Sequence, residues 1–326
     1  SQTLSSSAIL HVFLITSFGA LIVLLLQPEH GLAILAAICC MSLVVISGFI
    51  SSLLKGQGDF KSDALWKILI RTLTAGGILL ALFFSDDNTI TFLFVGWFIA
   101  MLLALIWPII KGYLKWPIYD FKSDFFKASI IFLTIDVATV FYFRSDIVLL
   151  KYFGNIDSDV GQYSAAYRLL EGIILLATPV AMIAFRYLRT HANNKKKFFH
   201  LIWILLLLML PVSILMVLLA FFFGSEFMVL VFGEEYFVAG TLLFWLLLSM
   251  FFILPNFILT QGAIALNKES GYAKIVVFIA IFNIALNIKL IPNFGAMGAA
   301  WSTIVAEGIL FFSLGLLLWR EKNRIK

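Results

Sequence analysis

Ten continuous apolar runs, each long enough to cross a lipid bilayer as a helix, make up most of this chain. A transmembrane helix needs about 20 apolar residues, and it satisfies its own backbone hydrogen bonds where no water is present. Strands of a membrane barrel would instead be about ten residues long, with alternating polarity. The runs lie at residues 7–26, 31–54, 65–84, 89–109, 127–150, 161–186, 198–222, 237–265, 270–290 and 296–319. The sequence therefore predicts an all-α, polytopic membrane protein with about ten transmembrane helices.

The composition agrees with this interpretation and excludes several classes of function. Hydrophobic residues make up 62% of the 326 residues and charged residues 13%, about half of the share found in soluble domains. The net charge of +5 is spread over the joins between the runs, so we expect no nucleic-acid partner. The two cysteines, Cys39 and Cys40, are adjacent within one run. They provide neither a disulfide framework nor a metal-ligand spacing.

The Lys and Arg residues give the predicted helices an orientation. If the N-terminus is placed in the cytoplasm and the joins alternate, the inner joins hold 19 of the 23 basic residues. The outer joins hold only Lys151 and Lys289. This bias follows the positive-inside rule. We therefore predict that both termini are cytoplasmic. The first run lacks a basic start and a small-residue cleavage site, so we interpret it as a true span rather than a signal peptide.

The longest polar join, at about residues 111–126, separates four runs from six. It contains Trp116 and Tyr119, and these residue types are typical of the membrane interface. We predict a first lobe of four helices at residues 1–115 and a second lobe of six helices at residues 116–326.

Six charged residues lie inside the runs, where a charge at mid-membrane costs roughly 2.5–3.5 kcal/mol and usually faces a cavity or a partner. They are Asp136, Arg144, Asp146, Arg168, Glu171 and Glu307. Arg144 and Arg168 both fall in the outer halves of their predicted helices, roughly 9–12 Å below the surface at 1.5 Å per residue. Two guanidinium groups facing one cavity would bind a phosphate group through bidentate hydrogen bonds.

A purely structural interpretation of the same charges is also open. Arg144 would then pair with Asp146 or Glu171, and Arg168 would pair with Glu171 at the i, i+3 spacing. Asp136 and Glu307 are candidates for proton or cation coupling. A hydrogen bond to a neighbouring helix is an equal alternative for Asp136.

Motifs of soluble enzymes are missing from the sequence. It contains no glycine-rich phosphate loop, no zinc-protease motif and no nucleophile elbow. The pair Asp157 and Asp159 matches a pattern with which glycosyltransferases hold a metal, but it lies in a short predicted outer join, where nucleotide sugars are absent. We interpret it as a solvated turn. The sequence therefore predicts no catalytic residue, no metal site and no cofactor, and the chain is not expected to be an enzyme.

Four stretches of the second predicted lobe resemble the polysaccharide biosynthesis and O-antigen (Wzx-like) flippases. These form part of the multidrug/oligosaccharidyl-lipid/polysaccharide (MOP) flippase superfamily, which has a MATE-like fold. The stretches are Arg144–Gly154, Val160–Glu171, Phe232–Tyr236 and Asn287–Ala300. The resemblance covers residues from about 125 to 326, and the first four runs fit the family only in their layout.

The resemblance implies two lobes of six helices around a central cavity, working by alternating access. Such a protein moves an undecaprenyl-diphosphate-linked oligosaccharide, an O-antigen or capsule repeat unit, from the inner to the outer leaflet of the bacterial cytoplasmic membrane. Carried over, Arg144 and Arg168 would face the diphosphate or acidic sugars, and Asp146 and Glu171 would line the same cavity. This chain has four helices before the linker instead of six, so the first two would be missing.

The implied partners are the lipid-linked oligosaccharide, membrane lipids and other glycan-assembly membrane proteins, as in lipopolysaccharide synthesis. One alternative function is a cation-coupled drug or metabolite antiporter of the same superfamily. Coupling carboxylates in the first lobe would favour it, but the first four runs carry no mid-span Asp or Glu. Another is a membrane-embedded glycosyltransferase or O-antigen polymerase. Those enzymes usually have a large outer loop, whereas the longest outer join here is about a dozen residues.

Overall fold

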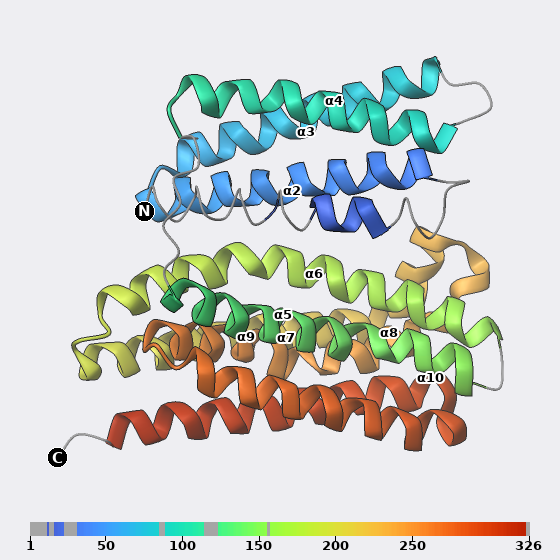
Figure 1. Ribbon diagram of the computed structural model, residues 1–326. Helices are drawn as coiled ribbons and strands as arrows, with labels where there is room; N and C mark the ends of the chain where they lie inside the picture. The colour runs from blue at the N-terminus through green and yellow to red at the C-terminus, as the bar shows by residue number, and fades with distance from the viewer. Residues whose placement is uncertain are drawn as a thin grey trace. The chain divides into compact units, whose positions relative to one another are not determined.

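A computed structural model describes residue 12 and residues 16–22, 31–84, 89–113, 123–154 and 157–323 of the chain (Figure 1). Its named helices are α2 (Gly31–Gln57), α3 (Phe60–Phe83), α4 (Thr89–Ile110), α5 (Ser123–Phe153), α6 (Asp157–Thr190), α7 (Lys195–Phe232), the short 3-10 helix η2 (Glu234–Tyr236), α8 (Ala239–Leu248), α9 (Met250–Ala265) and α10 (Glu269–Asn323). No strand occurs among these described residues. The prediction of an all-α fold is confirmed.

Most of these helices are long and apolar enough to cross a membrane. The described part of the chain holds eight such stretches, with α8 and α9 joined as one stretch, Ala239–Ala265. The last of them, α10, has 55 residues and would be about 80 Å long if it were straight, far more than the ~30 Å hydrocarbon core. Its backbone leaves the helical conformation at Gly295, so α10 supplies two spans. Nine predicted spans therefore have a counterpart in the described residues, and most of the first run, 7–26, lies outside them.

Many large apolar side chains are exposed on the surface of these helices. Phe83 is 83% exposed, Leu230 is 81% exposed and Leu176 is 79% exposed. Contiguous apolar surface of this kind is rare on soluble monomers and is normal where lipid is the solvent. The chain is therefore a multi-pass membrane protein.

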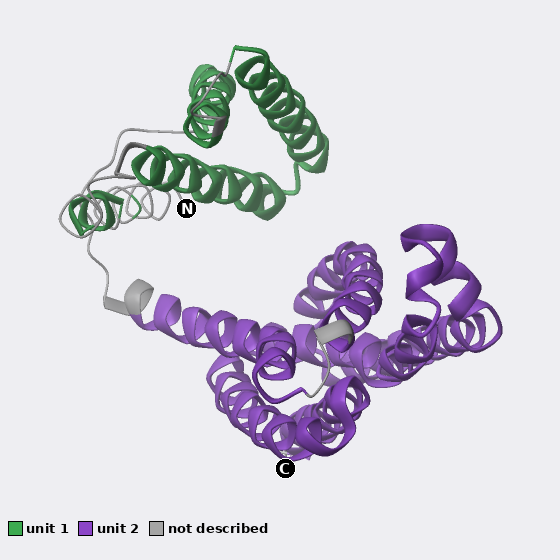
Figure 2. Cartoon of the chain, turned by 90° about the vertical axis from the view of Figure 1, so that its right-hand side faces the viewer, with its two compact units in different colours: residues 1–125 green, residues 126–326 purple. Residues whose placement is uncertain are grey.

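The chain forms two compact units, residues 1–125 and 126–326 (Figure 2). The predicted lobe boundary between residues 115 and 116, together with Trp116 and Tyr119, lies outside the described residues. The helices α2, α3 and α4 belong to the first unit. The second unit contains α5 from residue 126 onward and α6 to α10.

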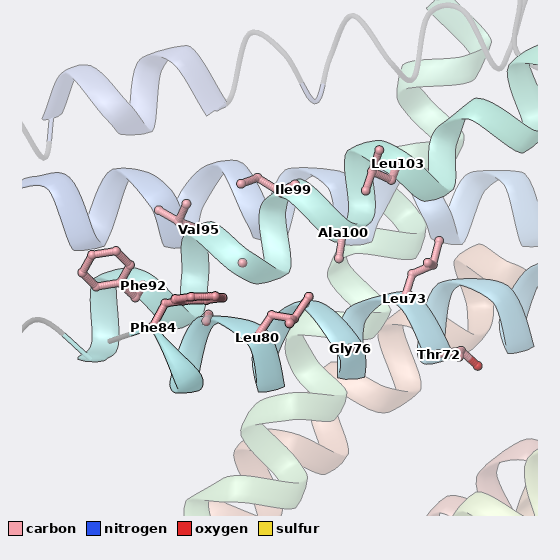
Figure 3. Close-up of a pocket in the computed structure, with 13 residues that line it drawn as sticks. Thr72, Leu73, Gly76, Leu80, Phe84, Phe92, Val95, Ile99, Ala100 and Leu103 are labelled. Carbon is pink, nitrogen blue, oxygen red and sulfur yellow. The ribbon is translucent and has the colours of Figure 1, made fainter. Parts of the chain in front are cut away.

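In the first unit, α4 packs against both α2 and α3. The ring of Trp66 stacks on that of Trp107, with 5.8 Å between ring centroids. Further along, α3 and α4 touch through Gly77 and Gly96. A Cβ added to Gly77 would lie 2.6 Å from the carbonyl oxygen of Gly96. Beside this crossing the two helices form an apolar groove of about 520 Å³, which also includes Gly76 (Figure 3).

In the second unit, α8 and α9 follow one another and form the interior element. Two thirds of the most apolar part of Ala239–Ala265 is buried, because α6, α7 and α10 pack around it. Glycine allows the closest approach here too, because a Cβ added to Gly240 would lie 2.4 Å from the Ser225 backbone of α7.

The break in α10 follows directly from the sequence. Gly295 has φ 52° and ψ −135°, a conformation that residues with a Cβ rarely adopt. A Cβ at this position would also lie 2.7 Å from Oδ2 of Asp159 at the start of α6. The two halves of α10 can therefore fold back on each other, which places polar residues from both halves together.

Candidate functional site

A buried carboxylate, Asp146 of α5, lies at the centre of a polar cluster in the second unit. Its side chain is 1% exposed. Its Oδ2 accepts hydrogen bonds from the hydroxyl groups of Tyr163 and Thr303, both at 2.9 Å. Its Oδ1 accepts one from Nδ2 of Asn287 at 2.9 Å. Three helices, α5, α6 and α10, therefore meet at this single side chain.

The two halves of α10 supply most of the cluster. Asn283 and Asn287 are one turn apart on the first half, and Nδ2 of Asn287 also donates to Oδ1 of Asn283 at 3.0 Å. From the second half, the Ser302 hydroxyl donates to Oδ1 of Asn287. From α5, the Ser145 hydroxyl donates to Asn283 at 3.3 Å. We call the group Ser145, Asp146, Tyr163, Asn283, Asn287, Ser302 and Thr303 the Asp146 cluster.

A second buried carboxylate, Glu307, lies one helical turn beyond Thr303 on α10 and is 2% exposed. It accepts a hydrogen bond from the hydroxyl of Tyr142, which lies one turn from Asp146 on α5. Nδ2 of Asn256 on α9 donates to Oε2 of Glu307 at 2.6 Å. Both carboxylates therefore lie where α5 meets the second half of α10. We call the Asp146 cluster together with Glu307, Tyr142 and Asn256 the polar strip of the second unit.

Neither carboxylate forms an ion pair with a described basic residue, in contrast to Asp63, Glu171 and Glu321, which pair with Lys67, Arg144 and Lys268. An unpaired buried carboxylate is costly in its charged form, so it is stabilised either by a proton or by a cation. The carboxylate, amide and hydroxyl oxygens of the Asp146 cluster are ligands that hard cations prefer. No described group of three His, Cys, Asp or Glu residues could hold a metal ion, so such a cation would depend on amides and hydroxyls.

Two buried polar atoms in this strip lack a hydrogen-bond partner, Nδ2 of Asn283 and Oδ1 of Asn256. Leaving such an atom unsatisfied costs about 1–3 kcal/mol and is uncommon in a resting protein interior. The Asp146 cluster therefore has an unused amide donor, Nδ2 of Asn283, and the surroundings of Glu307 have an unused amide acceptor, Oδ1 of Asn256.

Arg144 lies on the other side of α5 from this strip and pairs with Glu171 of α6. The distance from its Nη2 to Oε1 of Glu171 is 2.8 Å, and the Arg144 side chain is 59% exposed. Glu171 is placed there by the face of α6 that packs on α5. The same face carries Tyr163 and Tyr167, and the Tyr167 hydroxyl donates to the carbonyl oxygen of Phe143. Of the two ion pairs considered for Arg144, the structure contains the one with Glu171 and not the one with Asp146.

Arg168 lies apart from the Arg144–Glu171 pair, although Arg168 and Glu171 are three residues apart on α6. Its side chain is exposed and lines a pocket of about 580 Å³ between α6, α7 and α8. No described residue forms an ion pair with it. The structure therefore brings Arg144 and Glu171 together, places Asp146 in a separate buried cluster and leaves Arg168 at a pocket of its own.

Asp136 lies almost three turns before Asp146 on α5, and its side chain is exposed. It belongs to neither the Asp146 cluster nor the contacts of Glu307. The polar partners that sequence reasoning missed are Tyr142, Tyr163, Ser302 and Thr303. The sequence offers little sign of them, because single Ser, Thr and Tyr residues are common in apolar runs and do not show which residue they bond to.

No family model matches the chain. Among curated proteins, the chain is 26% identical over 263 residues to the probable low-salt glycan biosynthesis flippase Agl15 of Haloferax volcanii. The match covers 79% of this chain and 55% of that protein. The chain therefore spans about half the length of the curated relative it matches.

Solved structures with the same fold are transporters of the MOP superfamily. A mutant of the Vibrio cholerae MATE transporter VcmN has a TM-score of 0.77 at 16% identity, covering 99% of this chain and 80% of that one. An outward-facing multidrug resistance MATE transporter has a TM-score of 0.71 at 12% identity, with coverages of 98% and 78%. The lipid II flippase MurJ in an inward closed conformation has a TM-score of 0.68 at 17% identity, with coverages of 97% and 72%.

At these identities the solved structures define the fold of the chain and not its substrate. The curated relative and the solved structures named above are flippases and transporters, in agreement with the prediction that the chain is not an enzyme. The chain is a multi-pass membrane protein with a MATE-like fold.

Proposed function

We propose that the chain is the greater part of a flippase that moves a lipid-linked oligosaccharide across the cytoplasmic membrane by alternating access. The observation that carries this proposal is Arg168, a cation without an ion-pair partner among the described residues, placed within a membrane-spanning helix and beside an apolar pocket. An anionic lipid carrier joins a phosphate group to a hydrocarbon chain, and this combination of a cation and an apolar surface suits it. The similarity to Agl15 supports the same class of cargo.

The finer proposal is an undecaprenyl-diphosphate carrier with an O-antigen or capsule repeat, moved from the inner to the outer leaflet of a bacterial inner membrane. The Arg144–Glu171 pair would line the cargo cavity. Its guanidinium group would exchange the carboxylate for a phosphate or an acidic sugar of the cargo. Partners would be the lipid-linked oligosaccharide, surrounding lipids and other membrane proteins of glycan assembly.

Within this function, Asp146 and Glu307 would couple transport to a proton or a cation. A buried carboxylate that alternates between a bound cation and an empty state changes the stability of the helices around it. Here α5, α6 and both halves of α10 meet at Asp146, so binding there would bias the conformation of the whole second unit. Asp136, exposed on α5, is the weaker coupling candidate.

A second candidate function, a cation-coupled drug or metabolite antiporter, rests on the buried carboxylates Asp146 and Glu307. Two buried carboxylates without described basic partners are compatible with either cargo. The antiporter needs no phosphate-binding cation, whereas the flippase does, so Arg144 and Arg168 distinguish the two.

Transport by the full-length protein in proteoliposomes tests this proposal. A fluorescent lipid-linked oligosaccharide should become accessible to an added glycosidase with wild-type protein, and Arg144→Ala or Arg168→Ala should reduce the rate strongly at equal protein level. Normal transport of that lipid by both variants would contradict a cationic cargo site. Ion-driven efflux of a fluorescent cationic drug, with no movement of the lipid, would support the antiporter instead.

A further inference from the structure

The pocket beside Arg168 is almost entirely apolar and lies within the second unit. Its floor and walls come from α6, α7 and α8, and its volume is about 580 Å³. Leu176, Leu219, Phe223 and Phe227 are among its lining residues, and Arg168 is its one charged lining residue among the described residues. Pockets of about 300–1,000 Å³ with a few placed polar groups are typical of small-molecule sites.

Glycine makes this pocket wide. Gly172 lies one turn beyond Arg168 on α6, and a Cβ built there would meet nothing within 4 Å. Gly224 of α7 also lines the pocket, where α7 packs closely on Gly240 of α8. The α7–α8 contact is therefore fixed by backbone approach, while the side facing α6 stays open. From Arg168 to Leu176 the pocket follows α6 for eight residues, about 12 Å.

The pocket has the positive charge of Arg168 at one end and an apolar lining along the rest, so it matches a ligand with an anionic head and a hydrocarbon tail. The guanidinium group is placed to bind phosphate oxygens, and the apolar lining is placed to hold the hydrocarbon that follows them. The width left by Gly172 and the faces of Phe223 and Phe227 suit a methyl-branched, unsaturated chain better than a narrow groove would.

We propose that this pocket binds the first isoprenoid units of the polyprenyl carrier, with the carrier's phosphate at Arg168. This proposal rests on the proposed function, because that function supplies the polyprenyl carrier as the anionic lipid. It separates the roles of the two arginines. Arg168 holds the lipid end of the cargo on the α7 and α8 side of α6, while Arg144 and Glu171 lie on the α5 side.

Binding of undecaprenyl diphosphate to the full-length protein in phosphatidylcholine nanodiscs tests the proposal, with bound lipid counted by native mass spectrometry. A Cβ at Gly172 would meet nothing within 4 Å, so Gly172→Phe should place its ring in the pocket and weaken binding by about tenfold or more. Arg168→Gln should weaken binding as much, because it removes a charge-assisted contact. Arg168→Lys keeps the charge and loses the guanidinium geometry, so it should weaken binding less than Arg168→Gln. Gly161→Phe is the matched control, because Gly161 also lies on α6, has open space at its Cβ and does not line the pocket.

Unchanged binding by Gly172→Phe would overturn the proposal. Displacement of undecaprenyl diphosphate by an equal amount of phosphatidylglycerol would overturn it as well, because the occupant would then be an ordinary phospholipid. The liposome assay distinguishes this failure from that of the proposed function. If wild-type protein binds the carrier in the pocket but moves no lipid-linked oligosaccharide, only the flippase proposal fails. If it moves the lipid and Gly172→Phe moves and binds it equally well, only the pocket proposal fails.

Discussion

At the scale of single residues, the charged side chains inside the membrane have three different environments. Asp146 is buried and bonded by hydroxyl and amide groups, Arg144 is ion-paired and half exposed, and Arg168 faces a pocket. Each environment implies a different response to substitution. A buried acceptor that satisfies several donors contributes to folding, whereas an exposed ion pair contributes little stability and is retained for another reason.

Replacing Asp146 tests its structural and its coupling role together. Asp146→Ala leaves the Tyr163 and Thr303 hydroxyls and the Asn287 amide without their shared acceptor. Each buried donor left unpaired costs about 1–3 kcal/mol, so we expect a clearly lower melting temperature of the purified protein. Asp146→Asn keeps the volume and removes the charge, so it should lose ion-dependent transport while losing less stability. Val148→Ala, on the exposed side of the same helix, should leave both unchanged. Full ion-dependent transport by Asp146→Asn would contradict a coupling role.

Replacing Arg144 should affect transport and not folding. Because the side chains of Arg144 and Glu171 are 59% and 32% exposed, Arg144→Gln should change the melting temperature little. Transport of the lipid-linked oligosaccharide should fall by about tenfold or more if the guanidinium group binds a phosphate or an acidic sugar. Lys151→Gln, at the exposed end of the same helix, is the control. If Arg144→Gln clearly lowered the melting temperature as well as the transport rate, the Arg144–Glu171 pair would be structural.

At the scale of elements, glycines decide how closely the helices approach. In lipid, helices gain no hydrophobic driving force from each other, so small residues that allow close packing determine the contacts. The crossings of α3 with α4 at Gly77 and Gly96, and of α7 with α8 at Gly240, are of this kind. The sequence shows the glycines, but not which of them lie in a contact.

Two adjacent glycines of α3 give a direct test. A side chain at Gly77 would meet the Gly96 backbone of α4, whereas one at Gly76 meets nothing within 4 Å and lies in the apolar groove (Figure 3). We expect Gly77→Leu to force α3 and α4 apart and to lower the yield and melting temperature of the purified protein. Gly76→Leu should behave like wild type. Equal effects of the two substitutions would show that this crossing is not a tight contact.

At the scale of the whole molecule, the structure contains the predicted spans from residue 31 onward, and their orientation across the membrane is a prediction. The positions of the apolar runs correspond to described helices from residue 31 onward, including the two halves of α10 on either side of Gly295. The distribution of Lys and Arg predicts which ends face the cytoplasm, because positively charged joins are retained on that side.

Reporter fusions check this orientation. A reporter placed after Lys196, at the start of α7, should be active in the cytoplasm, and one placed after Asp157, at the start of α6, should be active on the outer side. The control is a fusion after Lys322, near the C-terminus, which should also be active in the cytoplasm. The reverse pattern at all three positions would invert the topology, and a mixed pattern would mean that a span is missing or added.

The sequence by itself determined the all-α class, the positions of the spans and the break in α10, because these depend on local properties. Apolar length selects a membrane helix, and a glycine permits the backbone conformation at residue 295. It also identified the charged residues inside the spans, since a charge in an apolar run needs no structure to be noticed.

Only the tertiary structure decided the partners of those charges. Asp146 and Thr303 are separated by 157 positions, and Tyr142 and Glu307 by 165. In a soluble helix the polar face points to water and the apolar face points inward, so the sequence shows which side is buried. Here both the lipid and the protein interior are apolar, so the hydrophobic pattern does not show which face of a helix points inward. The sequence could therefore place Arg144, Asp146, Arg168 and Glu171 at similar depth. Helix packing alone distributed them between a buried cluster, an ion pair and a separate pocket.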